Sequence, residues 1–270
     1  WYLQQLKQYE DTHGVRLLDY LDLHYYPQAP GVSLSPAGSA ATQALRLRST
    51  RSLWDPTYAD ESWIKDAGPE GGVIQLIPRM QAWVNQYYPG TKLAVTEYNW
   101  GALDHINGAV VQADVLGIFG REGLDLATLW DPPAATDPGA FAFRMYRNYD
   151  GAGGQFGDTL VHAASSDQDK LAIYAAQRTS DNALTLVIVN KATESLTGQL
   201  TVTNAEVGNA AVYRYSAADL AHIVRQPDLA LAAGVNEIAF PAQSITLLVV
   251  SSGPPVAYAE HMYLPALRRQ

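Results

Sequence analysis

The sequence contains no cysteine, which excludes disulfide bonds, thiol nucleophiles and cysteine-ligated metal sites. It also has no run of about 18 apolar residues, so no segment is predicted to span a bilayer. Charged residues make up only 17% of the chain, and acidic residues outnumber basic ones to give a net charge of −9. A chain with this charge is expected to bind neither nucleic acid nor an anionic membrane surface.

Several enzyme motifs are missing as well. A serine hydrolase of the α/β type would carry a Gly-x-Ser-x-Gly elbow, and none occurs. The six histidines are scattered, so no His-Glu-x-x-His zinc cluster is present. No glycine-rich phosphate turn follows a strand pattern, which disfavours an open, doubly wound nucleotide-binding sheet.

Apolar and aromatic residues are plentiful by comparison. Hydrophobic residues make up 47% of the chain, which is enough to bury a sizeable core. The 16 Tyr and 6 Trp outnumber the 5 Phe. Tyr and Trp present flat apolar faces with a polar edge, which suit sugar rings but also ordinary cores and interfaces.

The first 150 residues alternate strand and helix patterns, which predicts a parallel sheet covered by helices. Polar or aromatic residues end each strand, as at the active-site edge of a (β/α)8 barrel. Residues 28–70 are rich in Ser, Pro and Gly and are predicted to be irregular; so long a loop is typical of a functional segment. The strands are expected at Asp19–Tyr26, Lys92–Tyr98 and Leu124–Trp130, and the helices at 78–88, Ala109–Phe119 and 139–149.

The pattern changes after residue 150. Short strand patterns separated by turn signals predict an antiparallel β-sandwich over residues 151–252. Residues 253–270 have the composition of a Pro-bearing linker and tail and are expected to be disordered. The sandwich strands are expected at Leu171–Arg178, Leu184–Lys191, Gly198–Thr203, Ala211–Tyr215, Asn236–Phe240 and Ser244–Val250.

Glu97 is the sharpest chemical signal in the sequence. Strict alternation along Lys92–Tyr98 would place Leu93, Val95 and Glu97 on one face of the strand. A buried carboxylate is costly without a partner, and Lys92 points the other way. Its position at a strand end therefore favours a catalytic role for Glu97, and a paired structural glutamate is the alternative.

His24 ends the preceding strand, two residues after Asp22. It is expected to orient a carboxylate or bind a substrate hydroxyl, and a hydrogen-bonded core histidine is the alternative. Among the tryptophans, Trp130 is the best placed to stack on a sugar ring because it ends a strand. The candidates for such stacking are Trp54, Trp63, Trp100 and Trp130.

Four segments, KLAVTEYNWG, RSLWDPTYADESWI, LDLHYYPQ and GREGLDLATLW, resemble glycoside hydrolase family 44. Members of that family are endoglucanases and xyloglucanases built from a TIM-like barrel plus a β-sandwich, and the resemblance runs from residue 1 to about residue 250. It implies that Glu97, in TEYNWG, is the nucleophile of a retaining mechanism, which needs two carboxyl groups about 5–5.5 Å apart. The residues implied to orient Glu97 or bind sugar are His24, Tyr26, Trp54, Tyr98, Asn99, Trp100 and Trp130.

The acid/base glutamate of the family lies in an Asn-Glu-Pro motif, and that motif is absent from these 270 residues. In such barrels the acid/base follows strand four and the nucleophile ends strand seven. Glu97 ends the second of three predicted strands, which corresponds to about the last three βα units of a barrel. We therefore expect a C-terminal portion that is inactive when isolated and that needs a complementing N-terminal half.

The resemblance implies a retaining endo-β-1,4-glucanase, secreted by a bacterium, that cleaves β-glucan such as cellulose or xyloglucan. No cofactor is expected. A structural calcium ion is compatible with the family, but no EF-hand-like run supplies ligands, so no metal site is assigned. The alternative function is a non-catalytic glucan-binding fragment or partner subunit that has lost its acid/base.

Overall fold

The computed structural model describes three stretches of the chain, 1–68, 70–203 and 207–251. The predicted linker and tail at 253–270 lies outside these described residues. In the part of the chain that is described, no helix is long and apolar enough to cross a membrane.

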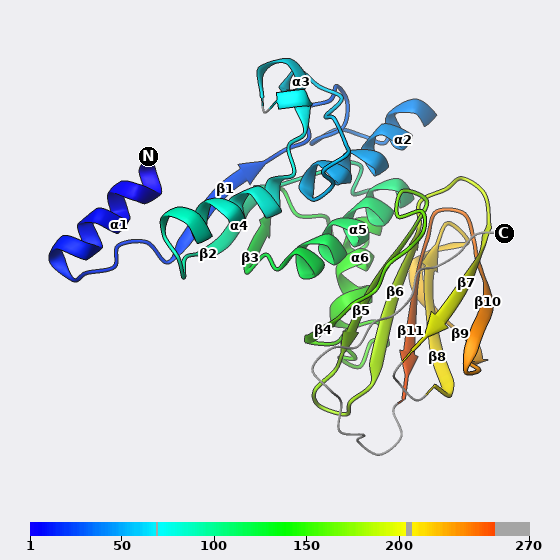
Figure 1. Ribbon diagram of the computed structural model, residues 1–270. Coiled ribbons are helices and arrows are strands. Elements are labelled where there is room, and N and C mark those ends of the chain that lie inside the picture. Colours follow the sequence, from blue (N-terminus) through cyan, green and yellow to red (C-terminus); the bar gives the residue numbers. More distant parts are fainter. Residues whose placement is uncertain (69, 204–206, 252–270) are drawn as a thin grey trace. The chain divides into compact units, whose positions relative to one another are not determined.

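The chain divides into two compact units (Figure 1). The first unit contains residues 1–101 and 118–132, and the second contains residues 102–117 and the described residues from 133 onward. Helix α5 (Ile106–Glu122) begins in the second unit and ends in the first.

A three-stranded parallel sheet, in the order β1-β2-β3, forms the centre of the first unit (Figure 1). The prediction of an α/β fold with a parallel sheet is confirmed. The strands are β1 (Tyr20–Tyr25), β2 (Lys92–Tyr98) and β3 (Leu126–Leu129). The helical segments are α1 (Tyr2–His13), α2 (Ala40–Arg48), η1 (Ser49–Leu53), α3 (Ile64–Ala67), η2 (Glu70–Gly72) and α4 (Leu76–Tyr87).

The segment 28–70 is more ordered than its composition predicts, because α2, η1 and α3 lie within it. Ser39 caps α2 by accepting a hydrogen bond from the Thr42 backbone N–H at 3.2 Å. Such a cap satisfies one of the free N–H groups in the first helical turn. The expectation of an irregular stretch was therefore wrong for this part of the segment.

Arg46 on α2 fixes the same segment against the end of β2. The side chain is fully buried, and its guanidinium donates to backbone carbonyls at 2.7–2.9 Å. These carbonyls belong to Gly31, Pro36, Ala37 and Trp100. One side chain therefore ties the loop after β1 to the residues that follow Glu97.

Gly101 is required at this junction for two reasons. Its φ is +76°, a left-handed conformation that L side chains adopt at a cost. A Cβ atom there would also lie 2.4 Å from the Val32 carbonyl oxygen. The glycine that ends the TEYNWG motif thus allows the loop backbone to approach the end of β2.

The second unit consists of two antiparallel sheets and two helical segments. Side chains from both sheets pack into one hydrophobic core, which includes Ile173, Leu186, Leu200 and Phe240. The larger sheet has the order β4-β5-β6-β11-β8-β9, and the smaller one pairs β10 with β7 (Figure 1). The elements besides α5 are α6 (Pro138–Arg147), β4 (Thr159–Val161), β5 (Leu171–Gln177), β6 (Leu184–Asn190), β7 (Leu196–Val202), β8 (Asn209–Ser216), β9 (Asp219–Ala230), β10 (Gly234–Phe240) and β11 (Ser244–Val250).

A buried ion pair lies on the other face of the larger sheet. The Lys191 ammonium lies 3.0 Å from Oδ2 of Asp114 on α5, and Tyr174 on β5 donates to Oδ1 at 2.6 Å. Asp114 is fully buried and the Lys191 side chain is 3% exposed. Paired charges of this kind fix the α5 segment of the second unit to the sheet, since neither is stable in an apolar interior alone.

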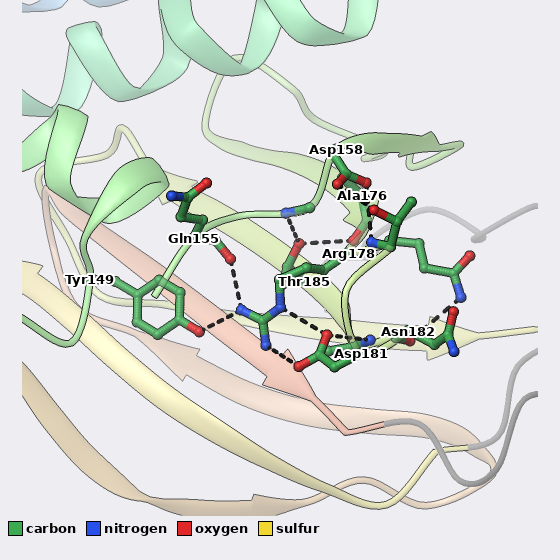
Figure 2. A network of polar contacts seen from close by, with 12 residues as sticks. Tyr149, Gln155, Asp158, Ala176, Arg178, Asp181, Asn182 and Thr185 are labelled. Atoms are coloured by element: carbon green, nitrogen blue, oxygen red, sulfur yellow. Dashed lines mark hydrogen bonds and ion pairs between the residues drawn. The ribbon is translucent and has the colours of Figure 1, made fainter. Parts of the chain in front are cut away.

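Arg178, just after β5, organises the glycine-rich segment 149–158 that follows α6 (Figure 2). Its guanidinium donates to the Tyr149 hydroxyl and the Gln155 carbonyl, both at 2.8 Å, and pairs with Asp181 at 2.7 Å. The hydrogen bond from Arg178 is the main reason that the pKa of Asp181 is lowered. This network fixes the segment 149–158 to the residues that follow β5 within the second unit.

Candidate active site

Glu97 lies at the carboxyl end of β2, with its side chain 29% exposed. The Tyr26 hydroxyl donates to Oε2 of Glu97 at 3.0 Å, and His24 Nδ1 lies 3.2 Å from the same oxygen. Within the described part of the chain, no side chain or backbone group donates to Oε1. Tyr26 therefore holds one carboxylate oxygen, with His24 close to it, and the other oxygen is open.

Strand β2 has a bulge just before Glu97, and strict alternation along the strand is therefore wrong. Leu23 of β1 pairs with Val95, but the next residue, His24, pairs with Glu97, so Thr96 has no partner in β1. Consecutive residues of β1 point to opposite faces, which places Val95 and Glu97 on opposite faces as well. The extra residue turns Glu97 to the face that carries His24.

The pairing of β2 with β3 shows the same irregularity. Val95 pairs with Ala127 and Tyr98 with Leu129, so β2 again has one residue more than its neighbour. A single inserted residue at Thr96 explains both register shifts. Two consecutive polar residues, Thr96 and Glu97, after three apolar ones are the signal in the sequence that could have revealed it.

Side chains from both flanking strands bond to Thr96. Asp22 of β1 accepts from the Thr96 backbone N–H at 3.0 Å and from its hydroxyl at 2.5 Å. The Thr128 hydroxyl of β3 donates to the Thr96 carbonyl. Sequence reasoning noted Asp22 only as a neighbour of His24, and it missed Thr96 and Thr128.

Tyr26 is a strong candidate for a residue that holds the carboxylate. Desolvation, and then its hydrogen bond to Glu97, raise the pKa of Tyr26 to about 12. The hydroxyl therefore keeps its proton, and remains a donor to Glu97, throughout neutral and moderately alkaline pH. Gln28, which sequence reasoning also missed, donates to the Tyr26 carbonyl at 2.8 Å and accepts from the Trp63 indole at 3.3 Å.

Three of the residues predicted to orient Glu97 or bind sugar are buried in the structure, and their role at the substrate stays a prediction. Trp100 is 1% exposed, donates from its indole to Ser49 at 3.0 Å and packs against Tyr25. Tyr98 is equally buried and makes an edge contact with Phe119. The apolar faces of these rings stabilise the core behind the site.

Asn99 is the third residue of this kind. It is 2% exposed, its amide donates to the Trp130 carbonyl at 2.7 Å, and its oxygen accepts from the Gly101 N–H at 2.6 Å. Both ends of the side chain are therefore bound to backbone groups. Asn99 fixes the loop after β2 to the end of β3.

Trp130 and Trp63 are the exposed tryptophans of this region. Trp130 is 53% exposed, and its backbone N–H donates to the Tyr98 carbonyl at 3.1 Å, beside Glu97 in the strand. Trp63 is 62% exposed and reaches Tyr26 through Gln28. Trp54 is half-buried, with the Arg121 guanidinium 4.3 Å from the ring centroid, and no contact links it to Glu97.

The described residues contain no group of three or more His, Asp or Glu side chains placed to hold a metal ion. The chemistry that the site can perform follows from Glu97 itself. A half-exposed carboxylate with one oxygen anchored and the other open is suited to nucleophilic attack or to proton transfer.

Comparison with known proteins finds relatives among glycoside hydrolases. A family model for glycoside hydrolase family 44 matches residues 1–29. The chain is 41% identical over 219 residues to endoglucanase A of Paenibacillus lautus, which covers 77% of this chain and 31% of that protein.

Solved structures extend the likeness over nearly the whole chain. CelM2, a bifunctional glucanase-xylanase from a metagenome library, superposes with a TM-score of 0.87 at 45% identity, covering 94% of this chain and 47% of that one. A Paenibacillus polymyxa xyloglucanase of family 44, solved with xyloglucan, gives 0.85 at 30% identity, covering 93% and 50%.

The proteins that these matches find similar to the chain are glycoside hydrolases. Over most of its length the chain is similar to proteins of glycoside hydrolase family 44. The chain spans about a third of the length of endoglucanase A and about half the length of the solved relatives.

Proposed function

We propose that this chain is the C-terminal portion of a retaining endo-β-1,4-glucanase in which Glu97 is the nucleophile. The proposal rests on the position of the Glu97 carboxylate and on the contacts of its two oxygens. It lies at the end of a parallel strand, with Oε2 bound by Tyr26 and near His24 and with Oε1 open. Similarity to family 44 supports a chemistry for this geometry, because retaining glycosidases use one carboxylate to attack and a second to donate a proton.

In the proposed reaction, Oε1 of Glu97 attacks the anomeric carbon of the sugar ring and forms an ester. The bond from that carbon to the leaving oxygen breaks, and a second carboxyl group gives its proton to the oxygen. Water, deprotonated by the same second group, then hydrolyses the ester and frees Glu97. The hydrogen bond from Tyr26 and the nearby His24 keep Oε2 in place while Oε1 reacts.

The second carboxyl group is proposed to lie on an N-terminal half-barrel that complements this chain. Residues 1–150 are proposed to form about the last three βα units of a (β/α)8 barrel, because only three parallel strands are present among the described residues. Both outer strands of such a sheet have a free edge, and closure of a barrel would remove both edges. Residues 151–252 are proposed to form a β-sandwich, a proposal supported by the core that the two antiparallel sheets share.

The proposed substrates are β-glucans such as cellulose and xyloglucan, since the relatives include an endoglucanase and a xyloglucanase solved with xyloglucan. Trp130 is the proposed stacking platform because it is exposed and its backbone N–H bonds to the carbonyl of Tyr98, the residue after Glu97. Polysaccharides of this kind lie outside the cell, so secretion by a bacterium is part of the proposal. The reaction as written needs no cofactor, and structural calcium stays a prediction.

Hydrolysis of xyloglucan and carboxymethylcellulose by the full-length protein tests the proposal. The Glu97→Gln variant should lose at least about a thousandfold in kcat, because no nucleophile remains. Glu237→Gln, a change at an exposed residue of strand β10 in the second unit, is the matched control and should leave kcat unchanged. Near-equal turnover by Glu97→Gln would contradict the assignment, and glucan binding without turnover by the wild type would support the non-catalytic alternative.

A further inference from the structure

The bulge at Thr96 decides which face of the sheet carries Glu97. Without the extra residue, the Glu97 side chain would lie on the same face of the sheet as Leu93 and Val95, which are at most 1% exposed. A carboxylate among those aliphatic side chains would lose its hydration and could not reach a substrate. The nucleophile role proposed above therefore depends on the extra residue in β2.

A bulge leaves backbone groups that the strand ladder does not pair, and such groups need partners. At Thr96 the partners are side chains. Asp22 takes the backbone N–H with one oxygen and the hydroxyl with the other, at 3.0 Å and 2.5 Å. The Thr128 hydroxyl donates to the carbonyl. One strand on each side thus satisfies both the N–H and the C=O of the inserted residue.

Asp22 and Thr128 do not contact the Glu97 carboxylate. No contact joins either side chain to the Glu97 carboxylate, whose neighbours in the described residues are Tyr26 and His24. Their effect on Glu97 passes through the backbone of the residue that precedes it.

We propose that Asp22 and Thr128 are positioning residues that hold the Thr96 bulge and so aim the Glu97 carboxylate at the anomeric carbon. This inference rests on the proposed function, because it assumes that Glu97 attacks the sugar. Misplacement of a reacting group by about 1 Å can cost about a hundredfold in rate. Loss of either side chain is therefore expected to slow attack by Glu97 while leaving substrate affinity nearly unchanged.

The test measures attack by Glu97 alone, with an activated β-cellotrioside that carries fluorine next to the anomeric carbon and traps the glycosyl ester. In the full-length protein, Asp22→Ala and Thr128→Val should lower the first-order inactivation rate constant by about ten- to a hundredfold. The inhibitor concentration for half-maximal rate should stay within about threefold of wild type, since binding subsites are untouched. Thr128→Ser keeps the hydroxyl and should restore most of the rate.

Asp19→Ala is the matched control, because Asp19 immediately precedes β1 and is exposed. It should inactivate at the wild-type rate. Thermal unfolding midpoints show whether each variant is folded, and if Asp22→Ala unfolds, the pair Thr128→Val and Thr128→Ser decides the question.

Peptide mass mapping separates the possible failures. Wild type labelled at Glu97, with unchanged rate constants in both Asp22→Ala and Thr128→Val, would overturn the positioning role alone. Wild type labelled at another carboxylate would overturn the proposed nucleophile and the positioning role together. A rate constant lowered by Thr128→Val and restored by Thr128→Ser would support the proposal.

Discussion

Two carboxylates in this chain, Asp114 and Glu97, lie in opposite surroundings. Asp114 is fully buried in the second unit, with Lys191 at one oxygen and Tyr174 at the other. Glu97 is 29% exposed at the end of β2 in the first unit, with both of its neighbours at the same oxygen. Both have a cationic or potentially cationic partner, so the presence of a partner does not distinguish them.

The two carboxylates differ in whether an oxygen atom remains without a hydrogen-bonding partner. Both Asp114 oxygens are bound, which is the arrangement that a buried charge needs to be tolerated. Oε1 of Glu97 accepts no hydrogen bond from the described residues, and the side chain is 29% exposed. The open oxygen therefore distinguishes Glu97, which has an atom left to react, from Asp114, which has none.

Removal of the Asp114 partner should have the largest effect on stability. Lys191→Met leaves a buried carboxylate without its ammonium partner, and the free energy of unfolding should fall by about 3–5 kcal/mol. Urea denaturation measures this loss. A change below about 1 kcal/mol would mean that Asp114 is not held by Lys191, and the comparison with Glu97 would fail.

The control for that prediction is Lys170→Met. Lys170 also pairs with an aspartate, Asp167, but its side chain is 49% exposed and the distance is 3.9 Å. Exposed pairs of this kind contribute about 0–1 kcal/mol. Lys170→Met should therefore unfold at nearly the wild-type urea concentration.

A smaller effect, on activity, is expected from Tyr26→Phe. The variant removes a hydrogen bond to Oε2 of Glu97, and a loss of about tenfold in kcat/KM is expected, which corresponds to about 1.4 kcal/mol. Tyr58→Phe removes the same kind of bond, from Tyr58 to Glu61 at 2.8 Å, and is the matched control. Equal effects of the two variants on kcat/KM would show that Tyr26 has no special relation to the site.

The smallest effect concerns alkaline pH. The pKa of Tyr26 is raised from 10.0 to about 12, with desolvation as the larger cause and the Glu97 hydrogen bond as the next. A raised pKa contributes stability that is complete below the unfolded pKa of about 10 and is lost as the pH rises to about 12. An ultraviolet difference titration of wild type against Tyr26→Phe should show one tyrosine ionising near pH 12, and a step near pH 10 would contradict this.

The sequence predicts the strands of the first unit well because each is a short apolar run between clear turn signals. The expected strand Lys92–Tyr98 is confirmed to the residue. Strand β9 (Asp219–Ala230) was missed for a physical reason: it lies at the edge of its sheet, is mostly exposed and contains Pro227. Edge strands lack the apolar alternation that marks a half-buried strand.

The site was only partly predictable. The strand-end positions of Glu97 and His24 were found from the sequence, and the structure brings the two together. The bulge, the roles of Asp22 and Thr128, and the burial of Trp100 were not, because each depends on the register between strands far apart in the chain. Aromatic composition alone cannot tell a sugar platform from a core residue.

Rescue of a nucleophile variant tests the central assignment most directly. Glu97→Ala in the full-length protein opens a space beneath the anomeric carbon, and azide can enter it to attack an activated β-cellotrioside. Azide is expected to restore turnover and to give the α-glycosyl azide, identified by nuclear magnetic resonance. A β-glycosyl azide, or full activity of Glu97→Ala without azide, would contradict the assignment of Glu97 as nucleophile.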